Sequence, residues 1–148
     1  MAKYIKKKKY NFLEHTADVK FLAYGKNLEE AFANSALALK ETISGDLFIE
    51  SKKEKTIKVS GEDMESLLYS FLEEFLYLLD AEDFLLSGIE DLHINEKEMT
   101  LDADVTGDDA SKYEFTNDVK AITYNEMKVG TKEIDDKRQY FCQVVLDV

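Results

Sequence analysis

The segment between Met64 and Leu79 constrains the fold most strongly, because its large apolar residues recur at helical spacing. They are Met64, Leu67, Leu68, Phe71, Leu72, Phe75, Leu76 and Leu79. Spacings of three and four residues place them on one face of a helix, which Ser60–Gly61 would open. Burying each large side chain contributes about 1.5–3 kcal/mol. We therefore predict a core helix, with a partner groove or a membrane surface as the alternative use of so wide a face.

An earlier strand and helix are also predicted. Val19–Gly25 is rich in β-branched and aromatic residues, which favour a strand. A helix is then expected to begin at Asn27, whose side chain is spaced to cap it together with Glu30. Gly45 is suited to end this helix. Its apolar face comprises Leu28, Phe32, Ala36, Leu39 and Ile43.

The other segments have the alternation of strands. They are Thr56–Val59, Phe84–Leu86, a hairpin from Leu92 to Val105 across a turn at Asn95–Lys97, Val119–Val129 and Tyr140–Val148. Turns at Gly130 and Asp135–Asp136 are expected to join the last two strands. The order predicts an α+β fold in which two main helices pack against a mixed or antiparallel β-sheet. Without Pro or a Gly/Ser linker, residues 1–148 are expected to form a single domain.

The chain is strongly acidic, with 31 Asp and Glu against 19 Lys and Arg and a net charge of −12. Such a surface disfavours direct contact with nucleic acid, which binds through Lys and Arg. The one dense basic run, Lys6–Lys9, is interpreted as a solvated leader, with a phosphate or partner contact as the alternative. No apolar run approaches the ~18 residues that span a bilayer. The lone Cys142 fits a reducing cytoplasm.

Candidate site residues lie near the two ends of the sequence. Glu14–Asp18 leads into a strand, and such loops often carry function, although an ordinary Asx or Ser/Thr turn is the alternative. The closing strand ends with Asp147 and Val148, whose oxygens suit hard cations such as Ca²⁺ or Mg²⁺. Paired with Asp18, they form a candidate metal site. Lys120 is either a solvated strand residue or a positive charge beside these carboxylates.

Four segments, in order along nearly the whole chain, make the sequence similar to the archease family. They are FLEHTADV at 12–19, AYG with LEEAF at 23–25 and 28–32, VKAITY at 119–124 and VVLDV at 144–148. Archeases are small acidic proteins that assist the GTP-dependent RNA ligase of tRNA splicing, which joins RNA ends bearing a 2′,3′-cyclic phosphate or a 3′-phosphate. The resemblance implies that this protein promotes guanylylation of the ligase's active-site histidine and supports multiple turnover. It is not itself expected to be a ligase or another enzyme.

The resemblance also implies a divalent metal ion, calcium in a crystal, with manganese or magnesium as alternatives. The ligands it implies are Asp18, Asp147 and Val148, and Lys120 matches a functionally important lysine of the family. His15 then becomes a neighbour of the metal or a group that faces the partner. The expected partner is the RNA ligase, so RNA would be met only indirectly, and no membrane is involved.

Two positions depart from the frequent family pattern. Lys20 stands where a Gly often follows HTADV, and Asn125 stands where a His often follows TY. An Asn side chain forms hydrogen bonds but does not titrate near neutral pH. Asn125 is therefore kept as a neighbour of the site without a role in proton transfer.

Two other classes of function stay open. One is an autonomous metal-dependent phosphoesterase or nucleotidyl-transfer enzyme, in which two carboxylates and a lysine position a metal-bound water. The sequence holds no GxGxxG, P-loop, GxSxG or HExxH motif, which argues against it. The other is a chaperone-like interaction module that uses the apolar face of the helix from Met64 to Leu79.

Overall fold

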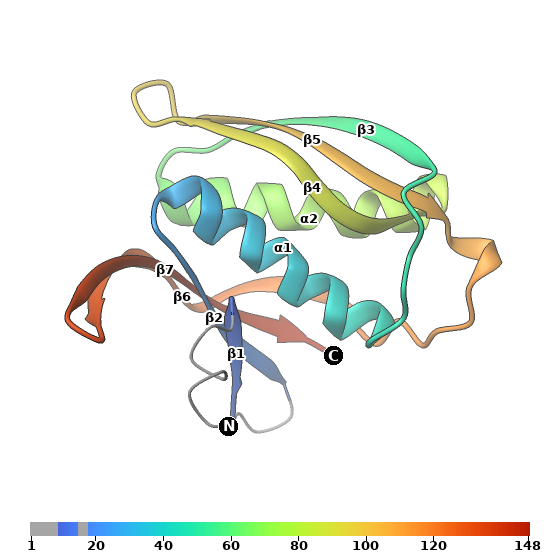
Figure 1. The fold of residues 1–148 in the computed structure, drawn as a ribbon, viewed down its shortest axis with the longest axis horizontal. Coiled ribbons are helices and arrows are strands. Elements are labelled where there is room, and N and C mark those ends of the chain that lie inside the picture. Colours follow the sequence, from blue (N-terminus) through green and yellow to red (C-terminus); the bar gives the residue numbers. More distant parts are fainter. Residues whose placement is uncertain (1–8, 15–17) are drawn as a thin grey trace.

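The computed structural model describes residues 9–14 and 18–148 (Figure 1). Its strands are β1 (Tyr10–Leu13), β2 (Val19–Gly25), β3 (Lys53–Ser60), β4 (Phe84–Asn95), β5 (Thr100–Asp109), β6 (Ala121–Ile134) and β7 (Lys137–Asp147). Its helices are α1 (Leu28–Ser44), α2 (Met64–Glu82) and the short 3₁₀ helix η2 (Ala110–Lys112). The strand predicted at Val19–Gly25 is confirmed, whereas β1 was not predicted. Of the basic run Lys6–Lys9, only Lys9 is among the described residues.

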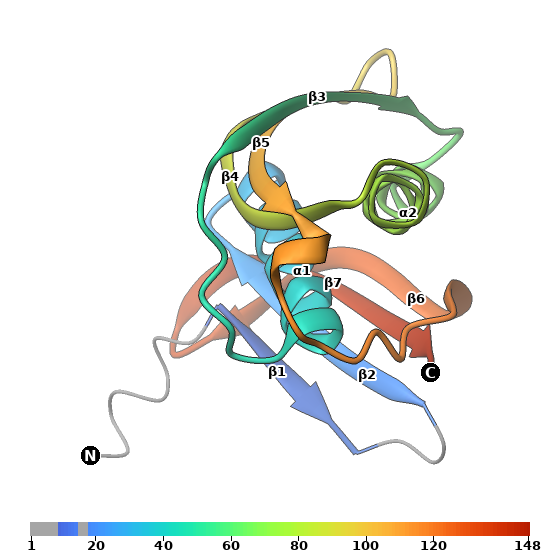
Figure 2. The same ribbon diagram turned by 90° about the vertical axis from the view of Figure 1, so that its right-hand side faces the viewer.

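Two antiparallel sheets enclose the two long helices. One sheet has the strand order β1-β2-β7-β6 and the other the order β3-β5-β4. Figures 1 and 2 show α1 and α2 in the layer between the sheets, and each helix contacts strands of both. The predicted α+β class is confirmed, with all strand pairs of the described part antiparallel. Within that part, no helix is both long enough and apolar enough to cross a bilayer.

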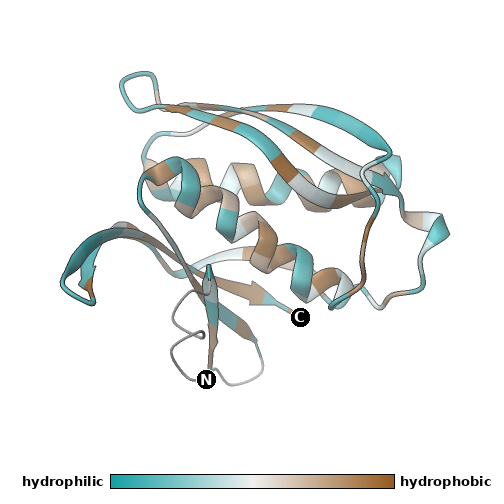
Figure 3. Cartoon of the chain, viewed as in Figure 1, coloured by the Kyte–Doolittle hydropathy of each residue, from teal (hydrophilic) through white to brown (hydrophobic). Residues whose placement is uncertain are grey.

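Helix α2 lies in the core, as its apolar face predicts. The buried residues of this helix are Leu67, Leu68, Phe71, Leu72, Phe75 and Leu78. Figure 3 shows apolar residues distributed along both helices. A helix enclosed between two sheets must bury a wide stripe rather than a narrow one. The buried face is therefore unavailable as the surface of a chaperone-like module or of a membrane-binding helix.

The start of α2 differs from the prediction at Ser60–Gly61. Asp63 is the N-cap: its Oδ1 accepts from the Ser66 N–H at 2.7 Å, and Ser66 Oγ accepts from the Asp63 N–H at 3.1 Å. This reciprocal pair is a capping box, which satisfies two N–H groups at the helix start. Gly61 instead permits a close approach, because a Cβ there would lie 2.6 Å from the Leu67 nitrogen.

Helix α1 has the predicted caps with one change. Asn27 Oδ1 accepts from the Glu30 N–H at 2.8 Å. Glu30 Oε1 accepts from the Lys26 N–H at 2.9 Å rather than from that of Asn27. At the other end Gly45 has a φ of 65° and donates its N–H to the Glu41 carbonyl at 2.8 Å. The positive φ explains why a glycine follows this helix.

The turn between β6 and β7 lies only at Asp135–Asp136, so the prediction of a turn at Gly130 was wrong. Both aspartates have positive φ, 54° and 64°, as expected for a two-residue hairpin turn. Gly130 instead pairs with Phe141 inside the sheet, and a Cβ at Gly130 would lie 3.2 Å from the Phe141 ring. The segment predicted as the strand Phe84–Leu86 continues into the hairpin arm as the single strand β4, which bulges after Leu86.

A buried carboxylate fastens the chain after β5. The Asp108 side chain is 1% exposed and accepts hydrogen bonds from Tyr113 Oη at 2.7 Å and Lys112 Nζ at 3.2 Å. Tyr113 Oη also accepts from the Glu50 N–H at 3.0 Å, which ties this segment to the chain before β3. The hydrogen bond from Tyr113, against the opposing effect of burial, lowers the pKa of Asp108 below its ordinary value.

Replacing Asp108 by asparagine is expected to lower the melting temperature at neutral pH. Because the pKa of the folded state lies below 3.8, the carboxylate stabilises the fold above that pH and loses its effect as the pH falls through the folded-state pKa. The difference from the wild type should therefore shrink below pH 3.8. Calorimetric melting temperatures of the wild type and the variant, measured from neutral pH to below pH 3.8, check this prediction. The variant Asp102→Asn, at an exposed position, is the control. A difference that stays constant with pH would contradict the role of the charge.

Candidate functional site

The pairing of β2 with β7 brings Asp18 to the closing residues. Val19, the first residue of β2, pairs with Leu146. Because the strands are antiparallel, continuing this register by one residue puts Asp18 opposite Asp147. Figure 2 shows the C-terminal end of β7 beside the start of β2. The two candidate segments of the sequence therefore meet at one end of the four-stranded sheet.

Strand β6 brings Lys120 to the other side of β7. Ala121 pairs with Asp147, and the Lys120 N–H donates to the Asp147 carbonyl at 2.7 Å. Two residues further along, Thr123 Oγ1 donates to the Val145 carbonyl at 3.0 Å. The end of β7 is thus held between β2 and β6, with Asp18 on one side of Asp147 and Lys120 on the other.

The two carboxylates at this end of the sheet suit a cation. Asp147 and Lys120 are exposed, Asp18 is half-buried, and Val148 packs partly against the core. Like charges directly opposite one another on neighbouring strands repel, and a cation between them offsets that repulsion. Carboxylate and main-chain oxygens are the ligands that Ca²⁺ and Mg²⁺ prefer.

The described residues include no group of three His, Cys, Asp or Glu side chains placed to hold a metal ion. Among the described residues, a main-chain oxygen is the further donor nearest in the chain to the Asp147 carboxylate. Val148, next to Asp147, is the residue that can offer it. This donor set consists of oxygens alone, so it fits a hard divalent cation better than a soft one.

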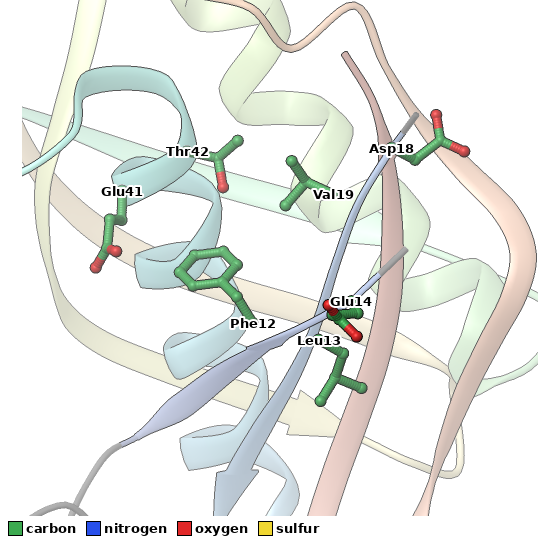
Figure 4. Close-up of a pocket in the computed structure, with 7 residues that line it drawn as sticks. All are labelled: Phe12, Leu13, Glu14, Asp18, Val19, Glu41 and Thr42. Atoms are coloured by element: carbon green, nitrogen blue, oxygen red, sulfur yellow. The ribbon is translucent and has the colours of Figure 1, made fainter. Parts of the chain in front are cut away.

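A pocket of about 700 Å³ opens beside Asp18, between the β1–β2 end and the last turns of α1 (Figure 4). Its lining residues are Phe12, Leu13, Glu14, Asp18, Val19, Glu41 and Thr42. The Asp18 carboxylate points away from Glu41 and Thr42, so Asp18 belongs to the margin of the pocket. Glu41 accepts a hydrogen bond from Tyr10 Oη at 2.7 Å, and burial together with this bond raises the pKa of Tyr10. Glu41 and Thr42 were missed by sequence reasoning, since nothing in the sequence of α1 distinguishes them from the other residues outside its apolar face.

Two candidate residues, His15 and Asn125, are not placed beside Asp147. His15 lies outside the described residues. Asn125 is exposed and lies in the irregular stretch of β6 between Thr123 and Lys128, away from the level of Asp147. A role for Asn125 at the cation site is therefore not supported by its position in the strand.

Lys20, the other departure from the family pattern, has a clear structural partner. Its Nζ contacts Glu126 Oε1 at 2.8 Å, and its side chain is only 17% exposed. Glu126 lies in the same irregular stretch of β6 and has a φ of 58°. Its main-chain carbonyl accepts a hydrogen bond from Gln143 Nε2 at 2.7 Å. Lys20 thus joins β2 to β6 across β7. No local sequence signal indicates this contact, because its partners are far apart in the chain.

The fold defines a class of small α+β protein in which two helices lie between antiparallel sheets. Residues 10–148 match the model of the Archease protein family (MTH1598/TM1083). The chain is 43% identical over 145 residues to protein archease of Pyrococcus furiosus, covering 95% of this chain and 99% of the relative. It is 41% identical over 126 residues to protein archease of Sulfurisphaera tokodaii, covering 84% and 90%.

A solved structure agrees with these relatives. The solution structure of Methanobacterium thermoautotrophicum protein 1598 superimposes with a TM-score of 0.78 at 33% identity, over 95% of this chain and 99% of that chain. The protein therefore belongs to the archease family, and the resemblance drawn from the four sequence segments is confirmed.

Proposed function

We propose that this protein activates the GTP-dependent RNA ligase of tRNA splicing, by promoting guanylylation of the ligase's active-site histidine and supporting multiple turnover. Membership of the archease family supports this role. The observation on the chain itself that carries the proposal is the meeting of Asp18, Asp147 and Lys120 at one end of the four-stranded sheet. The ligase carries the chemistry, and this protein is an accessory factor.

The second part of the proposal is a divalent cation held by Asp18, Asp147 and the main-chain oxygens of Val148. These oxygens would coordinate Ca²⁺, Mn²⁺ or Mg²⁺. Further coordination positions would remain for water or for a phosphate or carboxylate of the partner. Lys120, whose backbone bonds to Asp147, adds a point positive charge at the same edge. That charge suits a phosphate or an acidic side chain of the partner.

The net charge of −12 favours a basic partner. An enzyme that handles RNA presents basic surfaces, and complementary charge raises the rate of association. RNA would then be held by the ligase and not by this protein. We place this role in the cytoplasm. The only thiol, Cys142, is buried, and burial raises its pKa to about 12, so it is protected from oxidation there.

Ligation by the ligase from the same source, measured with and without this protein, tests the proposal. With RNA ends in large excess over the ligase, we expect repeated turnover only when the protein is present. An unchanged number of turnovers would contradict the proposal. Hydrolysis of nucleotides or phosphorylated RNA by the purified protein alone would instead favour the autonomous enzyme.

Extending the chain by two glycines after Val148 is expected to weaken divalent-cation binding about tenfold. The extension replaces a negatively charged carboxylate by a neutral peptide carbonyl, so one charge leaves the proposed ligand set. Calorimetric titration with Ca²⁺ and Mn²⁺ checks this, and the same two residues added before Met1 are the matched control. Unchanged affinity would show that the Val148 carboxylate is not a ligand.

A further inference from the structure

A second cavity, of about 920 Å³, runs along α1 and shares no lining residue with the pocket beside Asp18. Its walls come from α1, the end of β2, the hairpin that joins β6 to β7, and β4 where that strand bulges. Figure 1 shows that hairpin on the same side of the molecule as the start of α1. Apolar lining is supplied by Ala33, Leu37 and Ile89. The volume lies within the range of about 300–1,000 Å³ that is usual for small-molecule sites.

Basic residues outnumber acidic ones in the lining of this groove. The basic residues are Lys9, Lys26, Lys137 and Arg138, and the acidic residues are Glu30 and Asp135. None of the four basic side chains forms an ion pair with a residue that the structure describes. Arg138 is the only arginine of the chain, and among the described residues its guanidinium forms a hydrogen bond only with Thr131 Oγ1, at 3.5 Å. A concave, positively charged groove in an acidic protein attracts anions.

Asn34 adds a buried polar group to the groove. This lining residue is only 7% exposed, and its Nδ2 donates to the Tyr24 carbonyl at 2.7 Å. That bond fixes the orientation of the amide, and no donor among the described residues reaches the Asn34 Oδ1. Buried polar atoms normally have a hydrogen-bond partner. The exocyclic amino group of a nucleobase is a donor of the required kind.

We propose that this groove binds a mononucleotide, with the phosphates at Arg138 and the neighbouring lysines and the base against Leu37, Ile89 and Asn34. The planar fork of an arginine matches phosphate oxygens in a bidentate manner. A long nucleic acid strand would leave the groove and meet the acidic remainder of the surface. A mononucleotide keeps its charge inside the groove, within about one Debye length, roughly 8 Å, of the basic side chains. This binding is separate from the proposed activation of the ligase.

Calorimetric titration of the full chain with ATP tests the inference. EDTA in the buffer removes divalent cations, so the edge with Asp18 and Asp147 contributes nothing. We expect saturable binding that Arg138→Gln weakens about tenfold or more, since a charged hydrogen-bonding group is lost. The matched control is Lys97→Gln, which removes the same charge from an exposed turn outside the groove. Equal melting temperatures of the variants show that both fold.

Two further probes separate the nucleotide from other anions. Inorganic triphosphate offers the charge without a base, and a glutamate-rich peptide offers carboxylates without phosphate. We expect each to bind at least about tenfold more weakly than ATP, because neither fills the apolar part near Asn34. Affinity equal to that of ATP for either probe would overturn the inference. So would the absence of ATP binding, or an equal loss of affinity in Lys97→Gln.

Discussion

Replacing Asp18 or Asp147 by alanine is expected to abolish stimulation of the ligase and to leave the fold intact. Each substitution removes one of the two carboxylates proposed to hold the cation, and a single carboxylate with a main-chain oxygen is a weak ligand set. Neither side chain belongs to the buried core. Multiple-turnover ligation with each variant should fall to the level of the ligase alone.

The matched control for these variants is Asp80→Ala, which removes an exposed carboxylate from α2 that is not among the proposed ligands. It should stimulate the ligase as the wild type does. Melting temperatures of all three variants separate a lost site from a lost fold. Full stimulation by both site variants would remove Asp18 and Asp147 from the proposed mechanism, while leaving the family membership untouched.

Replacing Phe71 by alanine is expected to lower the free energy of unfolding by about 3–5 kcal/mol. Phe71 is fully buried, and its ring lies 5.0 Å from that of Phe75 and 6.3 Å from that of Phe32, measured between centroids. The truncated side chain would leave a cavity between α2 and α1 that the enclosing sheets cannot easily fill. Urea unfolding monitored by circular dichroism measures the change.

Tyr77, on the same helix, provides the comparison for Phe71. Its side chain is 56% exposed, so Tyr77→Ala should change the free energy of unfolding by no more than about 0.5 kcal/mol. A loss below about 1 kcal/mol for Phe71→Ala would contradict the assignment of the apolar face of α2 to the core.

Both helices and β2 were predictable because their signals are local. The helical spacing of apolar residues in α2 and the Asn27 cap of α1 can be found within a few turns of sequence. The division into two sheets was not predictable, because alternation shows that a strand has a buried face but not which strand lies beside it. β1 was missed because Tyr10–Leu13 is only four residues long and follows a basic run.

The candidate site was predictable in part. Asp18 and Asp147 were predicted from their carboxylate chemistry and from the family resemblance. The register of the strands then places them at the same end of the sheet as Lys120. The groove along α1 had no sequence signal, since its basic residues come from segments far apart in the chain. The net charge of −12 gives no indication of a local basic cluster. The pairing of Lys20 with Glu126 was hidden for the same reason.

Guanylylation of the ligase, measured with labelled GTP and Mn²⁺, tests the proposed activation most directly. Three reactions are needed: the ligase alone, the ligase with the wild-type protein, and the ligase with the Asp147→Ala variant. We expect faster labelling of the ligase's histidine only in the reaction with the wild-type protein. Equal rates of labelling in all three reactions would contradict the proposal that this protein activates the ligase through a cation at Asp18 and Asp147.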